Sequence, residues 1–161
     1  MRILQLLTVL AVQVFILNQI HLFGYITPLF IGYIMICCSK DTARIYLLLL
    51  GFVTGLLFDM FSNTAGMAAA ACTLQAMVLP YLLRLFTSYD APETFTPTIH
   101  TMGRWPYLAY SLMSMFVLHS VFYLLDAFTL YDWQLTLAAI AGSSVLGSLL
   151  CFFAELIVRR H

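Results

Sequence analysis

Charged residues are scarce in this sequence. Only 9% of the 161 residues are charged, 63% are apolar, and the mean hydropathy is +0.97. Soluble domains carry about 25% charged and about 45–50% apolar residues, so water is not the solvent for most of this chain. Seven Lys and Arg balance seven Asp and Glu. Because no surplus of basic residues is present to bind a phosphate backbone, we expect no nucleic-acid partner.

Metal-binding and catalytic patterns are also missing. The four cysteines form no CxxC pair and have no His at metal-ligand spacing, which excludes a structural zinc site and a disulfide framework: Cys37, Cys38, Cys72 and Cys151. The sequence lacks GxSxG, HExxH and P-loop motifs, and it has no close pair of membrane carboxylates. We therefore expect neither enzymatic activity nor a metal or cofactor.

Long charge-free runs are what the sequence does contain. A helix that crosses a bilayer needs about 20 predominantly apolar residues. The runs predict an all-α membrane protein that forms a single integral membrane domain over residues 1–161. We expect six transmembrane helices, at about 3–22, 24–38, 45–61, 66–86, 105–125 and 134–157.

The second of these crossings is the shortest. Thr27 and Pro28 form a favoured cap and first-turn pair, which delays regular helix until Pro28 and leaves irregular backbone sheltered by neighbouring helices before it. The sizeable loop at 87–104 contains two prolines, and we expect a hinge there between a four-helix half and a two-helix half.

The cations determine the expected orientation. With six crossings and a cytoplasmic N-terminus, every Lys and Arg falls on the inner side: Arg2, Lys40, Arg44, Arg84, Arg104, Arg159 and Arg160. This distribution is typical of the positive-inside rule. We expect both termini to be cytoplasmic, loop 87–104 to be cytoplasmic, and the outer turns to carry no cation.

Two glycines and a carboxylate share one stripe of the third expected helix. Gly51, Gly55 and Asp59 follow at steps of four, so they drift by only about 40° per step. Glycines allow a second helix to approach closely, and the carboxylate then faces protein rather than lipid. Asp59 is either a solvated interfacial residue, an N-cap for the next helix, or a buried acceptor that fixes the turn ending at Gly66; catalysis is the least favoured role.

Other polar groups within the spans have structural interpretations. The next helix opens with small residues from Gly66 to Ala70, which favour close packing. Gln75 is expected to form an interhelical hydrogen bond, and His119 to be neutral and hydrogen-bonded rather than a protonation switch. Glu155 precedes Arg159 by four residues, which favours an ion pair at the inner interface.

The stretch GFVTGLLFDMFSNTAGMAAA, from Gly51 to Ala70, resembles the most recognisable segment of MreD, the bacterial rod-shape-determining membrane protein family. The segment HLFGYITP, which ends at Pro28, is similar to the family's first outer turn and the proline that follows it. The resemblance implies a non-enzymatic scaffold of the elongation complex for peptidoglycan synthesis, in the bacterial cytoplasmic membrane. It implies a MreC-like single-span partner, and indirect contact with a MreB-like filament, a RodA-like glycosyltransferase and a penicillin-binding protein.

The same family is thought to share the fold of the S-components of energy-coupling-factor vitamin transporters. A substrate-binding S-component is therefore the alternative function. S-components dock on their energising subunit through a small-xxx-small pattern in the first helix, and here Phe15 follows Ala11 at that spacing, which disfavours the alternative.

We expect Gly51, Gly55, Asp59, Gly66, Ala70 and Pro28 to act in helix packing or partner binding. Either they hold two helices in a rigid frame whose lipid-facing groove accepts the partner's helix, or they line that groove themselves. The sequence leaves both arrangements open.

Overall fold

The computed structural model describes residues 29–64, 66–87, 95–126 and 133–158. Within these ranges every regular element is helical. The four long helices are α3 (Arg44–Ser62), α4 (Met67–Phe86), α6 (Arg104–Asp126) and α7 (Trp133–Val158). The short elements are η2 (Phe30–Gly32), α2 (Tyr33–Ile36) and α5 (Ile99–Met102).

Each of the four long helices is long and apolar enough to cross a membrane. The shortest, α3, has 19 residues and extends about 28 Å at about 1.5 Å per residue, close to the ~30 Å hydrocarbon core of a bilayer. All four begin and end within one residue of the bounds expected from the charge-free runs. The chain is therefore a multi-pass membrane protein.

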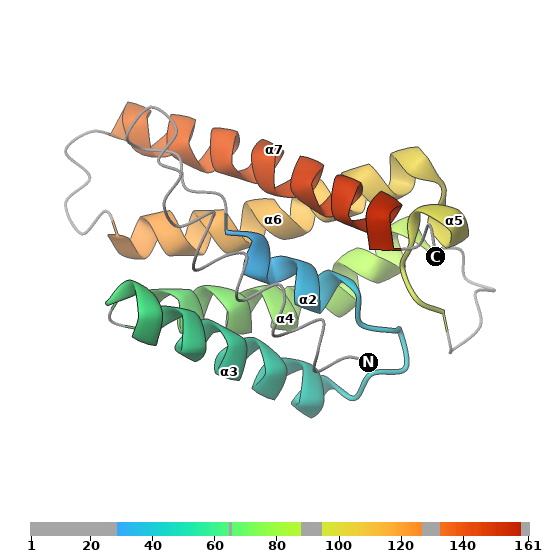
Figure 1. Cartoon of the computed structure of the whole chain (residues 1–161), viewed down its shortest axis with the longest axis horizontal. Helices are drawn as coiled ribbons and strands as arrows, with labels where there is room; N and C mark the ends of the chain where they lie inside the picture. The colour runs from blue at the N-terminus through green and yellow to red at the C-terminus, as the bar shows by residue number, and fades with distance from the viewer. Residues whose placement is uncertain (1–28, 65, 88–94, 127–132, 159–161) are drawn as a thin grey trace.

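The long helices form one row in the order α3, α4, α6 and α7, each running opposite to the next (Figure 1). Each helix packs against its neighbour in the row over a comparable extent. The helices on the two sides of loop 87–104, α4 and α6, pack as closely as the other neighbours, and the hinge expected in that loop stays a prediction. The short elements η2 and α2 lie against the row and contact all four long helices.

A regular helix over 24–38 is wrong for the described part of that range. Leu29 has an extended backbone, η2 begins at Phe30, and α2 ends at Ile36, so the helical part extends only about 12 Å. This segment is almost completely buried against the long helices. Hydropathy cannot distinguish a spanning helix from a short apolar segment buried among other helices, which is why the prediction failed. The expected first span, 3–22, and the irregular approach before Pro28 lie outside the described residues.

The described cations gather at one end of the row. Arg44 begins α3, Arg84 lies in the last turn of α4, and Arg104 begins α6, so the alternating helix directions bring all three together (Figure 1). The Arg44 guanidinium lies over the Tyr81 ring, 5.6 Å from its centroid. Asp126, at the end of α6, lies at the opposite end. This is the geometry that the positive-inside rule requires, and which end faces the cytoplasm stays a prediction.

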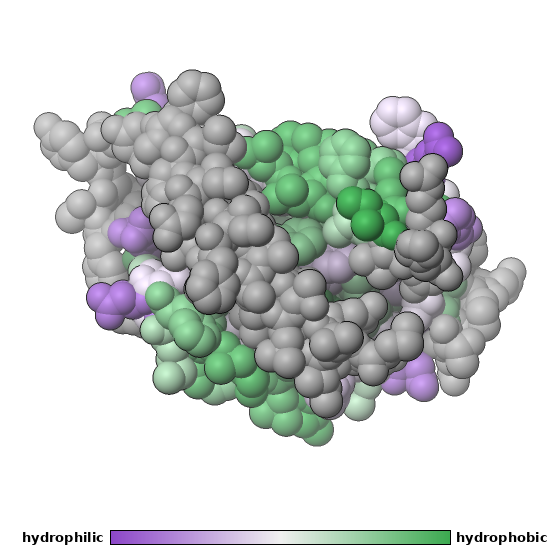
Figure 2. Space-filling view, in the orientation of Figure 1, coloured by the Kyte–Doolittle hydropathy of each residue, from purple (hydrophilic) through white to green (hydrophobic). Residues whose placement is uncertain are grey.

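The outward faces of the long helices are apolar. Exposed large hydrophobic side chains follow α3, α4 and α7, and the inward faces bury most of the polar residues together with further hydrophobic ones. Figure 2 shows hydrophobic surface along the sides of the molecule and hydrophilic residues at its two ends. Such a surface is the reverse of a soluble domain's and fits a lipid environment.

Candidate functional site

Gly51 and Gly55 lie where α3 and α4 approach most closely. A Cβ atom at Gly55 would stand 2.5 Å from both the Ala68 carbonyl oxygen and the Ala69 Cα. A Cβ atom at Gly51 would stand 2.8 Å from the Cys72 carbonyl oxygen. Non-bonded heavy atoms have their optimal separation near 3.5–4.0 Å, about 1 Å more than these distances, so the backbone contact requires glycine. The two glycines are thus occupied inside the α3–α4 hairpin.

Asp59 ties the end of α3 to the start of α4. Its two carboxylate oxygens accept hydrogen bonds from the backbone N–H groups of Ala68, at 3.0 Å, and Ala69, at 2.9 Å. These are two of the orphan donors that every helix N-terminus leaves, and the negative charge lies at the positive end of the helix dipole. The Thr64 hydroxyl also donates to this carboxylate. Asp59 is only 4% exposed, so it is both a buried acceptor that fixes the turn and a cap for α4, and the solvated interpretation is wrong.

The remaining expected site residues have different positions. Gly66 is the N-cap of α4 with φ +78°, a conformation that favours glycine, and no atom lies within 4 Å of where its Cβ would be. It therefore serves the turn rather than a helix contact. Ala70 is exposed on α4, and Pro28 lies outside the described residues.

A second polar arrangement surrounds the short segment at Leu29–Ile36. The Leu29 N–H donates to His119 Nε2 at 3.0 Å, and His119 Nδ1 donates to the Met115 carbonyl oxygen at 2.8 Å. Because Nε2 accepts, the proton of the neutral ring must be on Nδ1. His119 is fully buried. The expected neutral, hydrogen-bonded histidine is confirmed, and it holds the start of the short segment.

The α4 helix holds the middle of this segment. Gln75 Nε2 donates to Ser114 Oγ of α6 at 2.9 Å and reaches the Gly32 carbonyl oxygen at 3.5 Å. The expected interhelical hydrogen bond of Gln75 is thus confirmed. A Cβ atom at Gly32 would stand 2.8 Å from Gln75 Nε2 and 2.9 Å from a Leu118 methyl carbon, so glycine also permits this close approach.

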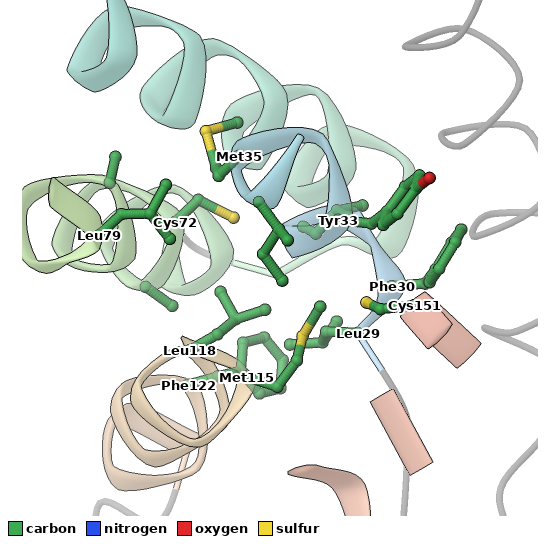
Figure 3. Packing of buried hydrophobic residues seen from close by; sticks show 14 of the residues in the cluster. Leu29, Phe30, Tyr33, Met35, Cys72, Leu79, Met115, Leu118, Phe122 and Cys151 are labelled. Atoms are coloured by element: carbon green, nitrogen blue, oxygen red, sulfur yellow. The ribbon is translucent and has the colours of Figure 1, made fainter. Parts of the chain in front are cut away.

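The α7 helix holds Tyr33, the first residue of α2, through Glu155. The Tyr33 hydroxyl donates to Glu155 Oε2 at 2.9 Å, and the carboxylate is 3% exposed. The expected ion pair with Arg159 lies outside the described residues. Figure 3 shows Leu29, Phe30 and Tyr33 beside side chains of the surrounding helices, with the apolar contacts made by Leu118 of α6 and Cys151 of α7 among others. One polar side chain from each of α4, α6 and α7 therefore fixes a short segment whose described helices are too short to span a membrane by themselves.

Two tyrosines of α6 complete the polar interior. Tyr107 and Tyr110 are fully buried, and within the part of the chain that the structure describes neither hydroxyl has a hydrogen-bond partner. A buried hydroxyl without a partner costs about 1–3 kcal/mol. Sequence reasoning missed both residues and Tyr33, because tyrosines near helix ends are common at membrane interfaces and carry no spacing signal.

The buried polar side chains of the described residues form hydrogen bonds between elements. No group of three His, Cys, Asp or Glu residues comes together as metal ligands in the ranges given above. Asp59 and Glu155, the two carboxylates that are buried in the described part of the chain, are both hydrogen-bonded, Asp59 by backbone N–H groups and Glu155 by a phenol. Comparisons with protein-family models, curated proteins and solved structures found no match to the chain.

Proposed function

We propose that this protein is a non-catalytic membrane scaffold of the bacterial cell-wall elongation complex, with a MreC-like single-span protein as its direct partner. The observation that carries the proposal is the α3–α4 hairpin. The residues that carry the resemblance to MreD are the residues that lock it: Gly51 and Gly55 at the helix contact, and Asp59 and Gly66 at the turn. A scaffold requires such a rigid frame.

The geometry favours the frame over the alternative in which the motif itself lines the partner groove. Both glycines already contact α4, and both Asp59 oxygens accept from the α4 backbone, so these three residues are engaged inside the hairpin. The outward side chains of the hairpin remain available, among them Phe52, Leu56 and Met77. The partner's transmembrane helix would lie along this lipid-facing side, where packing rather than the hydrophobic effect drives association.

The remaining parts of the proposal follow from the resemblance and the charge distribution. The protein resides in the bacterial cytoplasmic membrane with the end that carries Arg44, Arg84 and Arg104 in the cytoplasm. Its indirect partners are a MreB-like filament, a RodA-like glycosyltransferase and a penicillin-binding protein, and bilayer lipid covers its outer faces. Rod shape depends on it through organisation of peptidoglycan synthesis rather than through catalysis.

Copurification of the MreC-like partner tests this function. Gly55→Leu inserts a side chain into the α3–α4 contact and should abolish copurification and rod shape while the protein still inserts into the membrane. Ala141→Leu is the matched control, because it adds similar volume at an exposed position of α7, away from the hairpin. The proposal is wrong if the Gly55→Leu variant copurifies with the partner and supports rod shape as well as the control does.

A vitamin-binding S-component is the second candidate, and the segment Leu29–Ile36 favours it. Many membrane transporters bind substrate where a transmembrane helix is interrupted, and here the short helices η2 and α2 are held within the bundle by polar side chains. A pull-down in mild detergent followed by mass spectrometry separates the two functions. Recovery of wall-synthesis proteins supports the scaffold, whereas an ATPase module with a bound vitamin supports the S-component.

A further inference from the structure

Two exposed arginines flank one exposed tyrosine at the cation-bearing end of the α3–α4 hairpin. We name Arg44, Tyr81 and Arg84 the arginine–tyrosine patch. The Arg44 guanidinium lies over the Tyr81 ring, 5.6 Å from its centroid. Arg84 follows Tyr81 by three residues on α4, and residues at this spacing are neighbours on a helix surface, about 5–6 Å apart at Cβ. Both cations therefore lie beside the same ring, although they come from different helices.

The positive charge of the patch is not compensated within the residues that the structure describes. Over these residues neither guanidinium forms an ion pair or a hydrogen bond. The first turn of α3 contains no acidic residue, and α4 contains none along its length. Asp41, in the loop before α3, is exposed and forms no ion pair with them. Because like charges beside one ring repel each other, an anion bound between them is favoured.

The donors of the patch suit a phosphate group. A guanidinium carries five N–H donors in a planar fork, which matches the spacing of phosphate oxygens. The ring contact restrains Arg44 without supplying an oxygen acceptor. Such restraint lowers the entropy that the side chain loses when it binds a ligand. The patch is therefore prepared to donate to one phosphate from two sides.

An apolar stripe of α4 leads up to the patch. Leu74, Met77, Tyr81 and Arg84 follow at steps of three, four and three residues, so they share one helix face, and all four are exposed. The helix is long and apolar enough to span a membrane, and Arg84 lies in its last turn. The apolar part of the stripe then faces hydrocarbon while Arg84 lies near the headgroups. The ligand that fits combines a phosphate with an acyl chain.

We propose that the arginine–tyrosine patch binds the phosphate of an anionic phospholipid such as phosphatidylglycerol, with an acyl chain along Leu74 and Met77. Arg44 and Arg84 donate to the phosphate oxygens, and Tyr81 positions Arg44. A zwitterionic headgroup is disfavoured because it brings its own cation next to the two arginines. The site does not depend on the proposed scaffold function, although it lies on the side of the hairpin where the proposed partner helix would pack.

Competition between two lipids, followed by native mass spectrometry, provides the assay. The full chain in mild detergent is mixed with equal amounts of phosphatidylglycerol and phosphatidylcholine that have the same acyl chains, and the retained lipid is identified by its mass. A cation near a membrane surface contributes about fivefold to the attraction of anionic lipid, so two cations predict a preference of about 25-fold for phosphatidylglycerol. Higher salt should lower this preference, because exposed charges are screened.

Paired variants test which residues hold the lipid. Arg44→Gln and Arg84→Gln should each lower the preference about fivefold. Arg104→Gln is the matched control, because it removes an exposed arginine at the same end of the bundle, at the start of α6, and should keep the preference. All three side chains are exposed, so all three variants should fold. Tyr81→Leu removes the ring beside Arg44 and should weaken the preference, whereas Tyr81→Phe keeps a ring and should restore most of it.

Each outcome supports or overturns a stated part of the proposal. A preference that falls in Arg44→Gln and Arg84→Gln but not in Arg104→Gln supports the site. The proposal is overturned if phosphatidylcholine is retained as well as phosphatidylglycerol, or if Arg104→Gln lowers the preference as much as the patch variants do. Glycerol phosphate carries the phosphate without acyl chains, so displacement of the lipid by an equal amount of it would overturn the lipid assignment in favour of a soluble phosphate. Equal loss in Tyr81→Phe and Tyr81→Leu would overturn the positioning role of Tyr81.

Discussion

The contact between α3 and α4 can be tested by adding a single methyl group at Gly55. The new Cβ would stand 2.5 Å from the Ala68 carbonyl oxygen and from the Ala69 Cα, which are backbone atoms that no rotamer change can move. The two helices must therefore separate locally by about 1 Å to restore van der Waals distance. Overpacking costs about 1–3 kcal/mol, and the same movement stretches the Asp59 bonds one turn away. We expect Gly55→Ala to lower the free energy of unfolding by about 3 kcal/mol.

Gly51→Ala is the graded control on the same helix face. Its Cβ would stand 2.8 Å from the Cys72 carbonyl oxygen and 3.1 Å from the Ala76 Cβ. Both distances are longer than the 2.5 Å contacts at Gly55, so we expect a smaller loss of unfolding free energy, about 1–2 kcal/mol. Both values can be measured by titrating the protein in mild detergent with sodium dodecyl sulfate and following the fluorescence of its two tryptophans. A cost below about 0.5 kcal/mol for Gly55→Ala, or a larger cost for Gly51→Ala, would refute the close-contact argument.

Four further substitutions can be measured in the same titration. Both Asp59 oxygens accept backbone N–H groups, and Asp59→Asn replaces one of these oxygens with an NH₂ donor. It should lower the free energy of unfolding by about 1–3 kcal/mol. An unchanged stability would contradict the two hydrogen bonds to the start of α4. His119→Phe keeps a ring but removes the acceptor of the Leu29 N–H, so it should lower the free energy of unfolding by about 1–3 kcal/mol. An unchanged midpoint of the unfolding titration would contradict this role of His119. Tyr33→Phe removes the hydrogen bond to Glu155 and should lower the free energy of unfolding by about 1 kcal/mol. Tyr107→Phe removes a hydroxyl without a partner, so it should leave the stability unchanged or raise it. A greater loss of stability for Tyr107→Phe than for Tyr33→Phe would disprove this assignment of hydrogen bonds.

The long helices could be predicted from the sequence because lipid imposes a simple rule. A spanning helix must be apolar over about 20 residues, and charges at Arg44, Asp126 and similar positions interrupt the runs at the boundaries. The bounds of α3, α4, α6 and α7 therefore lie within one residue of expectation. The glycine and aspartate spacing also carried information, because residues four apart share a helix face.

The short segment Leu29–Ile36 could not be predicted in the same way. It lies inside a charge-free run, so hydropathy assigned it to a crossing helix. Its actual form depends on His119, Gln75 and Glu155, which come from three later helices and bind it from three sides. Such long-range contacts leave no periodic trace in the sequence.

The hydrogen bond between Tyr33 and Glu155 was missed for a related reason. The two residues belong to different elements and share no motif, and each has an ordinary local explanation near a helix end. Burial and hydrogen bonding distinguish them, and both are properties of the packed bundle. Sequence reasoning predicts membrane spans and local stripes better than the polar groups that meet in the interior.

Labelling of single cysteines from one side of the membrane tests the central claim most directly, namely that the cation-bearing helix ends share one side. In a Cys37→Ser background, Arg44→Cys, Arg104→Cys and Asp126→Cys are each exposed to a membrane-impermeant maleimide in bacterial spheroplasts. We predict that Asp126→Cys reacts in intact spheroplasts, and that Arg44→Cys and Arg104→Cys react only after permeabilisation. Reaction of either arginine replacement from outside, or of Asp126→Cys and Arg104→Cys from the same side, would contradict the account.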